Sequence, residues 1–292
     1  MTKHSGAWMI GGVGLAGLLL VLAGCTAPPQ EPRKPIPGKA TIDEAVAALQ
    51  ARRVALVPLR SGGQCRIKWW DDENKVHEES CSIELRVCPP QRVFLVGNGL
   101  LGEMIRLGAD ENAFYLRVKP KEVSAYWGGR RDQLAACGQT LWINPDNLLE
   151  ALGVVQVDRS WILQHENGTD VLTRLSPDGR LAKQIMIDCG GYRVRRIDYH
   201  APGGALTATI EMNDYETIDG GVVVPTWLQM TVYRAEGKHA VVTLDLSGVR
   251  RFEPTDAQKE KLFRPADTRG FKHVYRLDEH CRFVPQPTAD EE

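Results

Sequence analysis

The stretch QCRIKWWDDENKVHEESCSIELRV, residues 64–87, decides the fold class of this chain. Apolar and polar residues alternate through its first and last parts, which is the period of a β-strand with one buried face. Between these parts lies DDEN, residues 71–74, a polar run typical of a turn. The stretch therefore predicts two antiparallel strands whose apolar side chains share a face.

Cys65 and Cys81 lie symmetrically about Glu73 in this stretch. In a hairpin of that register they face each other, close enough to form a disulfide or to pack as two thiols buried in the sheet. Both interpretations stay open. An even number of cysteines follows Cys25, which permits disulfides in an exported protein: Cys65, Cys81, Cys88, Cys137, Cys189 and Cys281.

The alternation continues on both sides of this hairpin, and Pro225 indicates an edge or a bulge in one long strand. Further strands are predicted at 92–96, 102–107, 113–119, 122–127, 184–188, 192–200, 206–213, 222–234 and 240–246. Short helices are predicted at 41–52, 144–152 and 255–262, the first with the capping box Thr41-Ile42-Asp43-Glu44. We expect a mainly β (α+β) fold, in which a wide curled antiparallel sheet forms an incomplete barrel and short helices cover its concave face.

The first 24 residues have the features of a secretory signal. Lys3 supplies a positive start, and residues 7–22 are apolar and uncharged. This apolar run is shorter than the roughly 20 residues that span a bilayer, so it predicts a cleaved signal. It ends in Leu22-Ala23-Gly24-Cys25, which resembles the lipobox of bacterial lipoproteins.

That resemblance implies a mature chain that starts at Cys25 and is anchored in a membrane by acyl chains on this residue. Thr26 stands where an Asp would favour the inner membrane, so we expect the cell envelope, at the outer membrane and facing the periplasm. The expected plan is a signal peptide at 1–24, a Pro-rich linker at 25–40, one half-barrel domain at 41–285 and a polar tail at 286–292.

Several function classes are disfavoured by the sequence. The net charge of −1 lacks the basic excess typical of nucleic-acid binding. There is no Cys-x-x-Cys and no Gly-x-Ser-x-Gly, and His165-Glu166 lacks the second His of a zinc protease motif. His200 and His280 are interpreted as strand-end or surface residues. We expect a non-catalytic protein without a metal or cofactor.

The second half contains RRIDY (195–199), ATIE (208–211), NDY (213–215), GGVVVP (220–225) and WLQM (227–230) in this order. With FYLRVKP (114–120) and YWGG (126–129) before the middle helix, this order resembles the LolA/LolB-like periplasmic lipid carriers. The resemblance implies an incomplete barrel with helices as a lid over an apolar cavity for acyl chains. The chain departs from the carriers in its greater length, its six cysteines and the absence of an exposed hydrophobic loop of the kind that LolB uses.

Seven apolar residues are placed to share one face of their strands: Trp69, Ile83, Leu85, Phe114, Leu116, Leu228 and Met230. They can pack as an ordinary core or line an acyl cavity. Our first hypothesis is a membrane-anchored lipoprotein that binds a lipid or acyl group, as an acceptor or carrier of lipid or acylated protein. The alternative is a structural or assembly module of the envelope, which holds protein partners through its sheet edge or its Arg-rich surface and has a filled core.

Overall fold

The computed structural model describes residues 36–71, 73–100, 102–120, 123–137, 141–234, 237–264 and 267–287. The predicted leader, Cys25 and most of the linker lie outside these residues. From Ile36 onward the chain is one compact unit.

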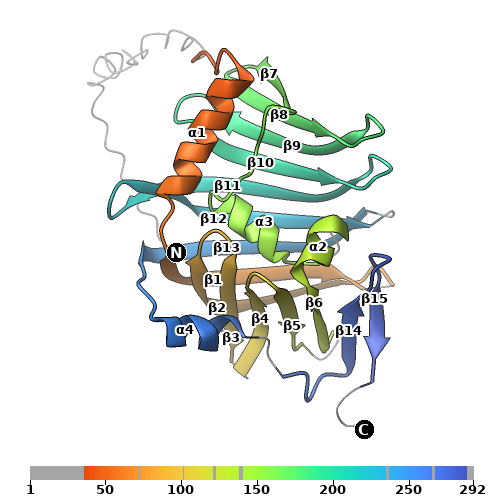
Figure 1. Cartoon of the computed structure of the whole chain (residues 1–292). Helices are drawn as coiled ribbons and strands as arrows, with labels where there is room; N and C mark the ends of the chain where they lie inside the picture. The colour runs from red at the N-terminus through yellow and green to blue at the C-terminus, as the bar shows by residue number, and fades with distance from the viewer. Residues whose placement is uncertain are drawn as a thin grey trace, which may run out of the picture. The chain divides into compact units, whose positions relative to one another are not determined.

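One sheet of fifteen strands runs through the described residues (Figure 1). Its spatial order is β15-β14-β6-β5-β4-β3-β2-β1-β13-β12-β11-β10-β9-β8-β7. One wing consists of β1–β6 with the C-terminal strands β14 and β15, the other consists of β7–β13, and β1 pairs with β13 where the wings meet. The strands are β1 (Leu59–Trp70), β2 (Val76–Cys88), β3 (Arg92–Gly99), β4 (Gly102–Ala109), β5 (Ala113–Val118), β6 (Ala125–Arg130), β7 (Ile162–Glu166), β8 (Thr169–Leu175), β9 (Leu181–Asp188), β10 (Arg193–His200), β11 (Leu206–Ile218), β12 (Val222–Arg234), β13 (Gly237–Arg251), β14 (His273–Leu277) and β15 (Phe283–Gln286).

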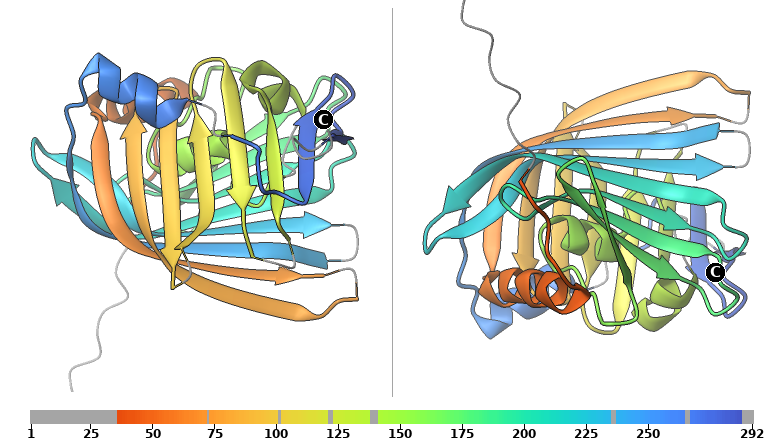
Figure 2. Two further views of the ribbon diagram at one scale, coloured as in Figure 1. Left: turned by 90° about the horizontal axis from the view of Figure 1, so that it is seen from below. Right: turned by 90° about the horizontal axis from the view of Figure 1, so that it is seen from above.

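The sheet curves without closing, and Figure 2 shows the two wings bent toward each other. The predicted mainly β class with an incomplete barrel is therefore confirmed. One strand pair corrects the antiparallel expectation, because β14 lies parallel to β6. After β13 the chain continues through α4 and returns to the edge of β6. There β14 runs in the same direction as β6.

Four helices are present in the described residues, one more than the sequence predicted: α1 (Ile42–Ala55), α2 (Arg131–Cys137), α3 (Pro145–Ala151) and α4 (Asp256–Phe263). Thr41 Oγ accepts the Glu44 amide at the start of α1, as the capping box predicts. α1 and α3 pack on the main core, on the concave side of the sheet. α4 covers the opposite face, where Phe263 packs on Phe94 and Val96 of β3.

The predicted hairpin is present, and Cys65 of β1 is directly opposite Cys81 of β2. The two sulfur atoms are not bonded: both cysteines are buried free thiols, which is the alternative to the predicted disulfide. A hydrogen bond to Cys81 and burial raise the pKa of Cys65 well above its usual value, so this thiol stays protonated. The disulfide in the structure joins Cys137 of α2 to Cys281 in the β14–β15 turn.

Pro225 lies inside β12, opposite Tyr215 of β11. The pairing of β12 with β13 begins only at Trp227, so the missing amide of the proline leaves no vacant place in that ladder. Next to it, Asp214 has a φ of 51° and its carbonyl accepts a hydrogen bond from Thr226 Oγ. The register of β11 and β12 is unshifted across Pro225, so the proline lies where β12 has an unpaired edge on the β13 side, and the alternative of a bulge is wrong.

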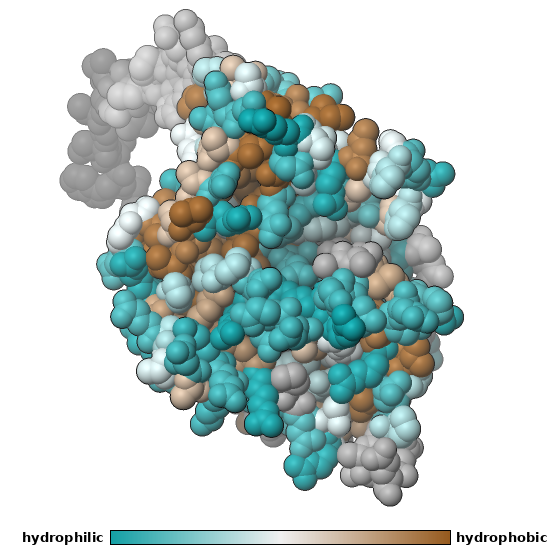
Figure 3. Space-filling model, in the orientation of Figure 1, coloured by the Kyte–Doolittle hydropathy of each residue, from teal (hydrophilic) through white to brown (hydrophobic). Residues whose placement is uncertain are grey.

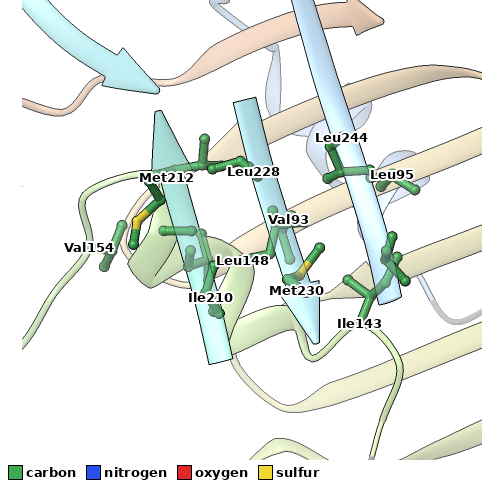
Figure 4. Packing of buried hydrophobic residues seen from close by; sticks show 14 of the residues in the cluster. Val93, Leu95, Ile143, Leu148, Val154, Ile210, Met212, Leu228, Met230 and Leu244 are labelled. Atoms are coloured by element: carbon green, nitrogen blue, oxygen red, sulfur yellow. The ribbon is translucent and has the colours of Figure 1, made fainter. Parts of the chain in front are cut away.

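The concave face of the sheet is filled by side chains. In Figure 4, Leu148 of α3 and Ile143 lie among Ile210, Leu228 and Met230 of β11 and β12. Trp142 extends this filling and packs against Trp69 at a ring distance of 5.7 Å. All seven residues predicted to share a face belong to this core cluster and are buried, as the packing interpretation requires.

Candidate functional site

A hollow of about 290 Å³ lies between the C-terminal half of α1 and the sheet, and we call it the α1 hollow. Its apolar lining consists of Ala48, Ala55, Leu56, Leu152, Val222 and Val223. Apolar surface gathers along α1 in the upper left of Figure 3, whereas the lower face is mainly hydrophilic. A concave, largely apolar site with a few polar groups is the usual form of a small-ligand site.

Two turns with small residues keep the α1 hollow open. Gly220 and Gly221, between β11 and β12, have φ values of 82° and 76°, a conformation that glycine adopts without strain. Gly191, between β9 and β10, lies against Arg193, because a Cβ at this glycine would be 3.0 Å from Arg193 Nε. These turns bring strand ends from β9 to β12 to the last turns of α1.

Two guanidinium groups complete the lining. Arg52 Nη1 donates to the carbonyl oxygens of Tyr192, at 2.5 Å, and Gly191, at 3.5 Å. Arg193 lies over the ring of Tyr215, 5.4 Å from its centroid. Burial lowers the pKa of Arg52, and the charge of Arg193 acts in the same direction. Neither arginine forms an ion pair with any Asp or Glu of the described residues.

The segment before α1 is fixed beside the same turn by a buried carboxylate. Asp170, which is fully buried on β8, accepts the Lys39 amide at 3.0 Å, His165 Nδ1–H at 2.8 Å and the Cys189 thiol at 3.2 Å. Burial raises the pKa of Asp170, but these hydrogen bonds outweigh it and hold the pKa below its usual value. Hydrogen bonds to Asp170 also help burial to raise the pKa of Cys189 to about 11, so Cys189 is not a reactive thiolate.

A second hollow of about 520 Å³, the polar cleft, lies between α3 and strands β8–β10. Lys183 on β9 is only 5% exposed there. Its Nζ is 2.5 Å from Glu150 Oε2 on α3, and Tyr199 of β10 donates to the same carboxylate oxygen. Burial lowers the pKa of Lys183, while Glu150 opposes this shift. The cluster fastens α3 to the sheet through charge-assisted hydrogen bonds.

The predicted histidines lie apart. His165 is bound to Asp170, His200 lines the polar cleft with its pKa lowered by burial, and His280 is exposed beside the disulfide. Within the described ranges, no three His, Cys, Asp or Glu side chains come together as a metal site. The sequence analysis did not single out Arg52 or Arg193, because they are 141 positions apart and only the fold brings them together.

One apolar side chain is exposed in a turn of the first wing. Leu100 is fully exposed, with a relative accessibility of 105%, in the turn between β3 and β4. A single exposed leucine is common on protein surfaces and does not contradict the expectation that the chain lacks an exposed hydrophobic loop. Among the described residues, no helix combines the length and hydropathy needed to cross a bilayer.

No family model matches this chain, and no curated protein matches it in sequence. Its structure is similar to that of a LolA superfamily protein from Nitrosomonas europaea, with 13% identity, a TM-score of 0.48 and coverage of 78% of this chain and 99% of that one. A putative outer membrane lipoprotein-sorting protein domain from Vibrio parahaemolyticus has the same identity and TM-score, with coverage of 76% and 97%. A DUF1329 family protein from Desulfovibrio piger has 12% identity and a TM-score of 0.48, with coverage of 79% and 100%.

Proposed function

We propose that this protein is a membrane-anchored lipoprotein of the cell envelope that binds a lipid or acyl group in the α1 hollow. The observation that carries the proposal is the apolar lining of this hollow between a helix and the curved sheet. Its place differs from the one that the sequence suggested, because the residues predicted to line a cavity are buried in the core and α3 fills the concave face.

The size of the α1 hollow limits what it accepts. Its volume of about 290 Å³ is at the lower end of the roughly 300–1,000 Å³ of small-ligand pockets. It suits the end of one acyl chain better than a complete multi-chain lipid. A protein that accepts one chain at a membrane surface fits an acceptor role.

The anchor is the second part of the proposal. Acyl chains on Cys25 contribute roughly 0.8 kcal/mol per buried methylene, so several chains hold a protein stably at a bilayer. The ten residues from Thr26 to Pro35 reach at most about 30 Å when extended, at roughly 3.1 Å each. The domain would thereby work close to the outer membrane, on the periplasmic side.

Two measurements test the proposal. Organic extraction of the purified protein removes non-covalent lipid but leaves covalent acyl chains, and mass spectrometry of the extract should identify an acyl lipid. Metabolic labelling with palmitate should label the wild type and leave Cys25→Ser unlabelled. An empty extract contradicts the binding proposal, and an unlabelled wild type contradicts the anchor.

A second candidate function is an assembly module that binds protein partners, and two observations favour it. The core is filled, and β7 is an edge strand whose residues are largely exposed, Ile162 among them. An unpaired strand edge is a template for a further strand. Site-specific photocrosslinking from Gln164 of β7 in intact cells tests it: a discrete crosslinked protein supports this function, and the absence of a crosslink contradicts it.

A further inference from the structure

We infer that the ligand of the α1 hollow carries an anionic headgroup, whose phosphate or carboxylate is bound by Arg52 and Arg193 while its chain lies against Ala48 and Val222. This inference rests on the proposed function and adds the chemical class of the ligand. Charge and geometry support it independently.

The charged side chains that line the α1 hollow are all positive, and the nearby Asp188, opposite Arg193 in the β9–β10 ladder, pairs with Arg195. The lining contains two arginines and no Asp or Glu. Arg251, close to Gly220, adds a third guanidinium beside the same turn. None of the three forms an ion pair within the part of the chain that the structure describes. Partly buried cations without a counter-charge are unfavourable, so an anion that enters this hollow gains both a charge and hydrogen-bond donors.

The geometry leaves donors available for this anion. Only Nη1 of Arg52 bonds to the backbone, to Tyr192 and Gly191, and the rest of the guanidinium has no partner among the described residues. Arg193 lies over the ring of Tyr215, and no hydrogen bond or ion pair within the described residues uses its guanidinium N–H groups. Arginine pairs of this kind bind phosphate or carboxylate with more than one hydrogen bond.

The apolar part of the α1 hollow favours an amphiphilic ligand over a free inorganic ion. The alkyl groups of α1 and the Val222 and Val223 side chains lie in the same hollow as the guanidinium groups. An inorganic anion uses only the charged part, and a neutral lipid uses only the apolar part. An amphiphile with one chain and one anionic group uses both.

Calorimetric titration of the purified full chain with single-chain amphiphiles tests this inference. The probes share a twelve-carbon chain: lauroyl lysophosphatidylglycerol, laurate and the neutral monolauroylglycerol. We expect the two anionic probes to bind roughly tenfold more tightly than the neutral one at low salt, because a hydrogen bond to a charged group is worth about one decade or more. Raising the salt concentration should reduce this preference.

Variants of the two neighbouring arginines assign the effect to the hollow. Arg193→Gln should lower the affinity for the anionic probes about tenfold and leave that for monolauroylglycerol unchanged. Arg195→Gln is the matched control: Arg195 lies over the same Tyr215 ring, but it pairs with Asp188 and is not part of the hollow lining. Arg193→Lys keeps the charge and should retain most of the preference, which separates the loss of charge from a folding defect.

The outcomes distinguish this inference from the proposed function. Equal binding of neutral and anionic probes overturns the anionic headgroup and leaves acyl binding intact, whereas the absence of binding by every probe overturns the proposed function itself. A final experiment measures the binding of the wild type and of Arg193→Gln to phosphatidylglycerol vesicles. If Arg193→Gln weakens vesicle binding but not lysophosphatidylglycerol binding, the arginines act at a membrane surface and the inference is wrong.

Discussion

Glu150 gives the buried ammonium of Lys183 its carboxylate partner, and Tyr199 shares that carboxylate. Breaking a buried ion pair from one side leaves an uncompensated charge, which costs about 3–5 kcal/mol. We predict that Glu150→Ala lowers the free energy of unfolding by about 3 kcal/mol, the low end of this range, because the Glu150 side chain is 19% exposed.

Urea unfolding followed by circular dichroism measures this change. The control is Asp132→Ala, which removes one partner of the exposed Arg130–Asp132 pair. Exposed pairs contribute little, so its effect should be much smaller. Similar losses in the two variants would contradict a structural role for the Lys183–Glu150 pair.

Because of Asp170, the free energy of unfolding of the domain should fall at acidic pH. Its pKa is below the usual 3.8 in the folded state, so the folded protein favours the carboxylate more than the unfolded chain does. The stabilisation is complete well above 3.8 and is lost as the pH falls through the lower folded pKa. Unfolding titrations from neutral to acidic pH should show this loss in the wild type and a flatter profile in Asp170→Asn. Parallel profiles would rule out Asp170 as its source.

At the scale of elements, the close contact of the segment before α1 with Asp170 and His165 depends on Gly38. A Cβ at this position would lie 1.8 Å from Asp170 Oδ1 and 2.4 Å from His165 Nδ1. Gly38→Ala should therefore displace the segment, cost about 1–3 kcal/mol and expose the Lys39 amide to hydrogen exchange. Gly203→Ala, where no atom lies within 4 Å of the added Cβ, is the control. Unchanged exchange at Lys39 in Gly38→Ala would contradict this role.

The disulfide between Cys137 and Cys281 fastens α2 to the β14–β15 turn across 144 positions of the chain. Peptide mapping under non-reducing conditions should recover this pair and find Cys65 and Cys81 as thiols that are alkylated only after unfolding. Cys281→Ser should lower the free energy of unfolding by about 2–5 kcal/mol. Recovery of a Cys65–Cys81 disulfide would contradict the structure and support the other interpretation of the sequence.

The elements that the sequence predicted are the ones with local signals. The register of Cys65 and Cys81 follows from the alternation on both sides of one turn, and the start of α1 from the Thr41–Glu44 capping box. α2, β14 and β15 were missed, and the predicted strands do not include β7 or β8. β14 is stabilised by a parallel contact with β6, almost 150 positions earlier, so its short sequence carries little of the information that places it.

The site was less predictable than the fold for the same reason. Alternation indicated which side chains face inward, but Leu228 and Met230 line a cavity only if no helix fills the concave face. α3 fills it, and its Leu148 packs directly on this core (Figure 4). The α1 hollow depends on turns and a helix end that meet only in the folded chain.

At the scale of the whole molecule, the curved sheet and the C-terminal half of α1 leave a small apolar site, and Tyr192 connects its lining to the segment before α1. Lys39 is bound to Asp170, and its ammonium lies 5.0 Å from the ring centre of Tyr192, one of the lining residues. In the proposed function, a tether from Cys25 joins the domain through this segment and holds the domain near a membrane. We therefore expect the hollow to exchange its ligand directly with that membrane.

Native mass spectrometry of the purified protein tests acyl binding in the α1 hollow most directly, with two variants on neighbouring positions of α1. Ala48 lines the hollow, whereas Ala47 is exposed on another side of the helix. The wild type and Ala47→Trp should each carry one non-covalent acyl lipid, and Ala48→Trp, which fills the hollow, should carry none. Equal lipid occupancy in Ala48→Trp and the wild type, or no lipid in any of the three proteins, would contradict acyl binding in the α1 hollow.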